Sequence, residues 1–171
     1  SSSAGDWYLV ALFNWDEASQ ATLTVPFALF TSNPTDFYTV FDFWDQRYCG
    51  TASRQLTVSV GPSTVRLLGL RPYAEHPMVL AVDSRITQGA SDLTAVEWDG
   101  NAKQLRGILQ ATEGTEYTLY ILCPSPYRPG DIEVRGENVR TGLVDNVLRV
   151  TFHCSQTGRV SWRATFDTEL K

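Results

Sequence analysis

The sequence predicts an all-β protein made of antiparallel β-sandwiches, arranged as two successive β units without significant helix. Its main periodicity is two, as where Leu56, Val58 and Val60 alternate with polar neighbours. Apolar residues nowhere follow the spacing of an amphipathic helix over three turns. Short apolar segments separated by turn residues at roughly ten-residue intervals are typical of sandwiches and barrels.

The first unit is expected to open with strands at 7–13 and 21–27. The stretch 38–50 then carries aromatic and charged residues together, and we expect one strand-like run that ends in a glycine turn. Such a strand would be covered on both sides, or its exposed face would meet a sugar or another domain. Strands at 56–60 and 65–70 flank Gly61-Pro62-Ser63, which predicts a β-hairpin.

The second unit continues the same pattern. Asp99-Gly100-Asn101 is a strong turn signal and predicts a hairpin between two of its strands. The segment 71–77 holds two prolines and is the best candidate boundary, which gives units of 1–73 and 74–171. Whether they form two cores or one continuous sandwich stays open. The strands expected in this unit are 78–83, 93–98, 104–110, 116–121, 132–135, 147–153 and 160–166.

Composition narrows the classes of partner. The chain has 171 residues and a net charge of −5, which argues against nucleic acid and anionic membranes. Its longest apolar run, 9–13, is far short of the roughly 20 residues that span a bilayer. The chain has three cysteines, Cys49, Cys123 and Cys154, so at least one thiol is free. Whether the other two form a disulfide is left open, and the cysteines do not decide the cellular compartment.

Catalytic signals are weak. The two histidines, His76 and His153, are interpreted as a surface residue and a residue at the edge of the core, and no nucleophile elbow, zinc or phosphate-loop motif occurs. No cofactor is expected, although calcium bound by Asp131, Glu133 or Glu97 stays open. Carboxylate pairs that glycoside hydrolysis would require are interpreted as surface groups; they are Asp42/Asp45, Glu97/Asp99 and Asp131/Glu133.

Aromatic residues beside polar ones give the ligand-binding hypothesis. Sugars present apolar C–H faces and hydroxyl groups, so their sites combine a flat ring with planar polar side chains. Trp98 lies at a predicted hairpin tip and Tyr127 in a proline-rich loop, whereas Trp44 is interpreted first as a buried structural residue, with an interdomain contact competing against a ligand. The candidate ligand-binding residues are Trp98, Tyr127, Trp44, Glu97, Asn101 and Arg128.

Three segments resemble a known family. They are W-Y-L-V-A-L-F-N-W at 7–15, F-D-F-W-D-Q-R-Y-C-G at 41–50 and L-T-V-S-V-G-P-S-T-V-R-L-L-G-L at 56–70. Together they resemble the C-terminal β-domain of α-galactosidase-like (melibiase-type) glycoside hydrolases. The continuation from His76 to Asp99 resembles a further β-region that follows this domain in some bacterial members, so the resemblance covers about 7–123.

The resemblance implies a non-catalytic role. In these enzymes the catalytic carboxylates lie on a preceding (β/α)₈ barrel, which needs roughly 250 residues, so no catalytic residue is carried over. The leading hypothesis is an accessory module that binds polysaccharide or oligosaccharide, with Trp98 and Tyr127 as stacking rings. The alternatives are a structural domain that buttresses the catalytic barrel of the same polypeptide, with Trp44 as a framework residue, and a small independent hydrolase. Localisation is unknown, and would be secreted or periplasmic for part of an exported glycosidase.

Overall fold

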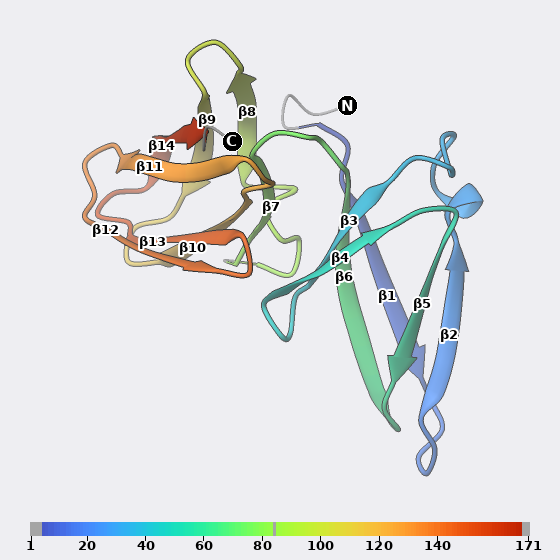
Figure 1. Cartoon of the computed structure of the whole chain (residues 1–171). Coiled ribbons are helices and arrows are strands. Elements are labelled where there is room, and N and C mark those ends of the chain that lie inside the picture. Colours follow the sequence, from blue (N-terminus) through green and yellow to red (C-terminus); the bar gives the residue numbers. More distant parts are fainter. Residues whose placement is uncertain (1–4, 84, 169–171) are drawn as a thin grey trace. The chain divides into compact units, whose positions relative to one another are not determined.

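The computed structural model describes residues 5–83 and 85–168 as a chain of antiparallel strands (Figure 1). It divides into two compact units, one formed by Trp7–Tyr73 and the other by the chain from Ala74 onward together with the described residues before Trp7; the latter is called the unit that begins at Ala74. The predicted all-β class is confirmed: the helical element among the described residues is a short 3₁₀ turn, η1 (Phe27–Leu29). Within the same residues no helix is long and apolar enough to span a bilayer.

The Trp7–Tyr73 unit consists of an antiparallel sheet and a separate two-strand ribbon. Its sheet has the order β1 (Tyr8–Asn14), β6 (Thr64–Pro72), β3 (Tyr38–Asp42) and β4 (Arg47–Ala52). The ribbon pairs β2 (Ala21–Pro26) with β5 (Gln55–Val60). Both have an apolar side, and burying these sides against each other is the main source of stability for such a unit.

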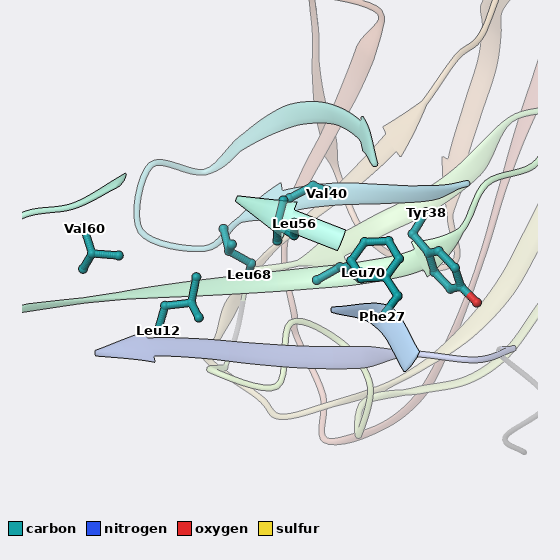
Figure 2. Packing of buried hydrophobic residues seen from close by; sticks show 8 residues of the cluster. All are labelled: Leu12, Phe27, Tyr38, Val40, Leu56, Val60, Leu68 and Leu70. Atoms are coloured by element: carbon teal, nitrogen blue, oxygen red, sulfur yellow. The ribbon is translucent and has the colours of Figure 1, made fainter. Parts of the chain in front are cut away.

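The core of this unit lies between the sheet and the ribbon (Figure 2). Phe27, Val60 and Leu70 are fully buried there. The ring of Phe27 meets the ring of Tyr38 edge-on, with centroids 5.2 Å apart. The cluster draws on β1, β3, β5, β6 and η1, and its buried members are Leu12, Phe27, Tyr38, Val40, Leu56, Val60, Leu68 and Leu70.

Two sequence predictions about this unit are wrong. The segments 56–60 and 65–70 do not form a hairpin, because β5 pairs with β2 while β6 pairs with β1 and β3. The turn at Gly61–Ser63 carries the chain from one layer to the other instead. The 38–50 run is also not one strand: it breaks at Phe43–Gln46, where Gln46 has a φ of 48°, and forms the β3–β4 hairpin.

The unit that begins at Ala74 contains two antiparallel sheets. One has the order β12 (Val139–Val144), β13 (Val147–His153), β10 (Glu116–Leu122) and β7 (Met78–Val82). The other has the order β11 (Tyr127–Val134), β14 (Gly158–Thr168), β9 (Gln104–Ala111) and β8 (Leu93–Asp99). In β9 and β14 buried residues alternate with more exposed ones, as expected for a sheet with one buried face, whereas β7 and β10 are buried along almost their whole length.

The turns of this unit were partly predictable. The hairpin at Asp99–Asn101 is confirmed, because β8 pairs with β9 and Oδ1 of Asp99 accepts bonds from the backbone N–H groups of Asn101 and Ala102. Strand β12 was not predicted. It pairs with β13 across Asp145-Asn146, and both of these residues have positive φ, the geometry of a tight two-residue hairpin turn.

Candidate functional site

Trp98 and Tyr127, the two predicted stacking residues, come together in the structure. Their rings meet edge-on with centroids 5.4 Å apart. Trp98 also stacks on His76 at 5.2 Å with an interplanar angle of 3°, and contacts Phe166 at 5.8 Å. Both predicted residues are half-buried. The indole therefore already has aromatic partners within its own unit, and one of its faces is occupied by the imidazole.

The polar residues expected beside them are placed less favourably. Glu97 precedes Trp98 in β8, and successive strand residues point to opposite faces, so its carboxylate lies on the other side of the sheet. There it forms an ion pair with Arg106 at 2.9 Å. Asn101 and Arg128 are exposed, in the β8–β9 turn and near the start of β11 respectively. Trp44 belongs to the other unit.

Charged side chains form a row across the outer face of the β11-β14-β9-β8 sheet. The strand register places Glu97 opposite Arg106, Arg106 opposite Arg163, and Arg163 opposite Glu133. The two outer pairs are ion pairs, with Nη2 of Arg163 lying 2.6 Å from Oε2 of Glu133. The next row on this face consists of Ala95, Ile108 and Ser161.

This face is hollowed into an open groove of about 480 Å³. Its size falls within the range of roughly 300–1,000 Å³ that small-molecule sites occupy. Charged, polar and apolar groups all contribute to it, so it can supply both hydrogen bonds and an apolar contact surface. The lining residues are Ala95, Glu97, Gln104, Arg106, Gly107, Ile108, Glu133, Arg135, Ser161, Trp162 and Arg163.

Three strongly exposed aromatic residues of the described chain lie elsewhere, in the Trp7–Tyr73 unit, around one surface hollow. Trp15 is 82% exposed and stacks on Phe13, which is 51% exposed, with centroids 5.4 Å apart and rings 5° from parallel. Trp44 is 53% exposed. All three residues line one surface hollow of about 800 Å³. We refer to Phe13, Trp15 and Trp44 as the aromatic patch.

The turn that carries Trp44 is held in place from beneath. Oδ1 of the fully buried Asp42 accepts hydrogen bonds from the backbone N–H groups of Trp44 and Asp45, both at 3.0 Å. Its other oxygen lies 2.6 Å from Nη2 of Arg66 in an ion pair outside hydrogen-bonding geometry. Arg66 also reaches Asp45 at 3.1 Å. A fixed turn displays its indole without further ordering, which favours binding.

Asn14 fixes the second side of the patch. It ends β1 between Phe13 and Trp15, and its buried side-chain amide donates to the carbonyl oxygens of Ser19, Val60 and Gly61 at 2.8–3.1 Å. Its Oδ1 accepts from the backbone N–H of Asp16. The stacked rings are therefore carried by a hydrogen-bonded corner and not by a loose loop.

Metal and thiol chemistry find little support in the described residues. Over 5–83 and 85–168, no three His, Cys, Asp or Glu side chains gather where they could hold a metal ion. The calcium candidates Glu97 and Glu133 are each engaged by an arginine. The cysteines are free: Cys49 is exposed, while Cys123 and Cys154 are buried.

Two side chains in or directly after β10, Tyr120 and Cys123, have raised pKa values. Burial, together with the charge of Asp83 and a hydrogen bond to it, raises the pKa of Tyr120 to about 12, and the guanidinium of Arg149 opposes this shift. Burial raises the pKa of the Cys123 thiol to about 11. Both groups are uncharged at neutral pH, which is consistent with structural roles.

Sequence reasoning missed the residues that carry the strongest surface features. Phe13 and Trp15 alternate in and just after β1 and so share a face, a pattern that could have identified them as an exposed pair. Arg106 and Arg163 carry no local signal, because they become neighbours only through the pairing of β9 with β14.

The Trp7–Tyr73 fold, with its buried core and displayed aromatic patch, defines a β-sandwich domain with an uncovered apolar surface. Comparison with protein families identifies it more closely. Residues 1–70 match the family model of the alpha galactosidase C-terminal beta sandwich domain. The resemblance read from the sequence is confirmed over these residues, and its continuation to 123 lies beyond the match. The match covers no catalytic domain, and no curated protein matches the chain.

Proposed function

We propose that the Trp7–Tyr73 unit is a structural domain that docks on the catalytic domain of an α-galactosidase through the aromatic patch. The observation that carries this proposal is the exposure of Phe13, Trp15 and Trp44 around one surface hollow. Large clustered apolar groups on a soluble surface mark interaction sites. Tryptophan is also the residue type most enriched at the energetic centres of interfaces.

The surroundings of the patch support a protein partner. Asn14 and Arg66 line the same hollow, and both are fixed by contacts described above. The patch therefore consists of apolar rings rimmed by polar groups on a rigid frame, which is the usual anatomy of a protein interface. An α-galactosidase C-terminal domain has one obvious partner of this kind, the catalytic domain of its own enzyme.

Association of separately produced domains tests the proposal. The chain is mixed with the catalytic domain of the α-galactosidase to which it belongs, and complex formation is followed by analytical ultracentrifugation. We expect a complex to form, and the double variant Trp15→Ser, Trp44→Ser should lower its affinity at least about a hundredfold. Two tryptophans that become buried in an interface typically contribute energies of hot-spot size. Leu29→Ser is the matched control, because Leu29 is a strongly exposed apolar residue outside the patch.

Two results would count against docking through this patch. One is the absence of any complex at concentrations well above those of typical transient assemblies. The other is a complex that the double variant and the Leu29 variant weaken equally. The sequence immediately upstream of the chain in its gene gives an independent check, because a barrel-coding region is expected there.

Binding of a carbohydrate by the unit that begins at Ala74 is a second candidate function. It is favoured by the open groove on the β11-β14-β9-β8 sheet, to which the predicted residue Glu97 contributes. The residues predicted from the sequence form a separate candidate site of this unit, with Trp98 and Tyr127 as stacking rings and Asn101 and Arg128 as hydroxyl partners, whereas Trp44 belongs to the other unit. Affinity electrophoresis against a panel of plant polysaccharides tests it, and retention of affinity in Trp98→Ala and Tyr127→Ala would contradict that assignment.

A further inference from the structure

The centre of the groove contains two arginines in direct cross-strand opposition. Arg106 in β9 and Arg163 in β14 are register partners. Like charges directly opposite each other on adjacent strands are destabilising. Each guanidinium is drawn outward to a glutamate on the neighbouring outer strand, Arg106 to Glu97 and Arg163 to Glu133. Both arginines line the groove.

The ion pairs leave hydrogen-bonding capacity on both sides. Nε and Nη2 of Arg106 approach the same oxygen, Oε2 of Glu97, at 3.2 and 2.9 Å. Nε and Nη2 of Arg163 likewise approach Oε2 of Glu133, at 2.7 and 2.6 Å. A guanidinium has five N–H donors and a carboxylate has two oxygens. The contacts above use neither the Nη1 groups of the two arginines nor the Oε1 atoms of the two glutamates.

The charge of the groove opposes that of the chain. Among the described residues that line it, three arginines face two glutamates, a net charge of +1. The whole chain has a net charge of −5. An anionic group placed between Arg106 and Arg163 would relieve their mutual repulsion and form charge-assisted hydrogen bonds.

The remainder of the groove fits a sugar better than a bare ion. Ala95 and Ile108 offer a short apolar floor beside the charged row, while Gln104 and Ser161 add neutral hydrogen-bonding groups. The volume of about 480 Å³ is far larger than a small inorganic anion requires. These features match a molecule with a C–H face, several hydroxyl groups and a single carboxylate.

We propose that this groove binds an oligosaccharide that contains a uronic acid, with the sugar carboxylate between Arg106 and Arg163. Oε1 of Glu97 and of Glu133 accept bonds from sugar hydroxyl groups, and Ala95 and Ile108 contact the ring. This inference rests on the second candidate function, carbohydrate binding, and specifies its site and its ligand class.

Calorimetric titration of the full chain tests the inference. The probes are an oligogalacturonate, a neutral galacto-oligosaccharide of the same length, and inorganic sulfate. We expect the oligogalacturonate to bind at least tenfold more tightly than the neutral sugar, and its affinity to fall with rising salt. Arg106→Gln and Arg163→Gln should each weaken binding about tenfold to a hundredfold, the usual effect of losing hydrogen bonds to a charged group.

Arg140→Gln is the matched control. Arg140 is also an exposed strand arginine paired with a glutamate, Glu116, but it lies on the β12-β13-β10-β7 sheet. It should leave the affinity unchanged, and thermal unfolding of all three variants shows whether they remain folded.

Other outcomes overturn the inference in distinguishable ways. Saccharide binding that is lost in Trp98→Ala or Tyr127→Ala but kept in the Arg106 and Arg163 variants refutes the groove and preserves carbohydrate binding. Equal affinity for the neutral sugar refutes the uronic acid, and sulfate that binds as tightly as the oligogalacturonate refutes the saccharide. The absence of binding to either saccharide refutes this inference, and the absence of binding to every polysaccharide of the panel refutes the second candidate function as well.

Discussion

Asp42 is fully buried, and its carboxylate lies 2.6 Å from the guanidinium of Arg66. The same carboxylate accepts the backbone N–H groups of Trp44 and Asp45 through its other oxygen. One side chain therefore links the end of β3 to β6 and fixes the turn that displays Trp44. A buried charge in such a position depends on its partners, because removal of one leaves the other uncompensated.

Replacement of Asp42 by alanine should lower the free energy of unfolding by about 3 kcal/mol or more, the typical cost of breaking a buried pair from one side. Urea denaturation measures this loss. Arg47→Gln is the control, because Arg47 and its partner Asp45 are both substantially exposed, and it should cost less than about 1 kcal/mol. Similar losses in the two variants would show that the buried pair has no special role.

The fold class was predictable because alternation and turn residues are local signals. Segments such as 56–60 show their period directly, and most predicted strands overlap observed ones, although β12 was missed and 38–50 proved to be a hairpin. The pairing of strands was not predictable in the same way. A hairpin between 56–60 and 65–70 fits the local pattern, yet β5 and β6 belong to different layers because their apolar faces are buried against each other.

The candidate sites show the same limit. Trp98 and Trp44 stand out in the sequence because their neighbours are polar. In the structure Trp98 stacks on His76, whereas Trp44 is exposed. The juxtaposition of Arg106 with Arg163 has no counterpart in the sequence. It exists only once β9 and β14 are aligned in their register.

Ionisation of Tyr120 should lower the free energy of unfolding as the pH becomes alkaline. Its pKa in the folded chain is raised to about 12 by burial and by Asp83, whereas an unfolded tyrosine ionises near 10. Between these values the unfolded chain loses the proton first, so the stabilisation is complete below pH 10 and declines as the pH rises toward 12. Tyr120→Phe should show a shallower decline than the parent chain in urea denaturation across this range, and identical slopes would contradict the assignment.

The three thiols should differ in reactivity. Cys123 and Cys154 are buried, and burial raises the pKa of the Cys123 thiol to about 11. Cys49 is exposed, although partial desolvation also raises its pKa. Because the thiolate is the nucleophile, iodoacetamide should modify Cys49 alone in the folded chain, faster as the pH rises, and all three in denaturant. Mass spectrometry identifies the sites, and early labelling of Cys123 or Cys154 would contradict their burial.

Gly107 should be intolerant of any side chain. A Cβ atom there would lie 2.6 Å from Cζ2 of Trp162 and 2.7 Å from the backbone oxygen of Ala95. Trp162 is 4% exposed and pairs directly with Gly107 across β14 and β9, so neither neighbour can move without disturbing the core. Gly107→Ala should therefore lower the free energy of unfolding by roughly 1–3 kcal/mol, the usual cost of overpacking.

Gly142→Ala is the matched control for this change. Gly142 also lies within a strand, β12, and a Cβ atom there meets nothing within 4 Å. Its substitution should change stability by no more than about 0.5 kcal/mol, as surface substitutions usually do. Thermal and urea unfolding of the two variants measure the difference. If alanine at Gly107 is tolerated as well as alanine at Gly142, the close packing of Trp162 against β9 is incorrect.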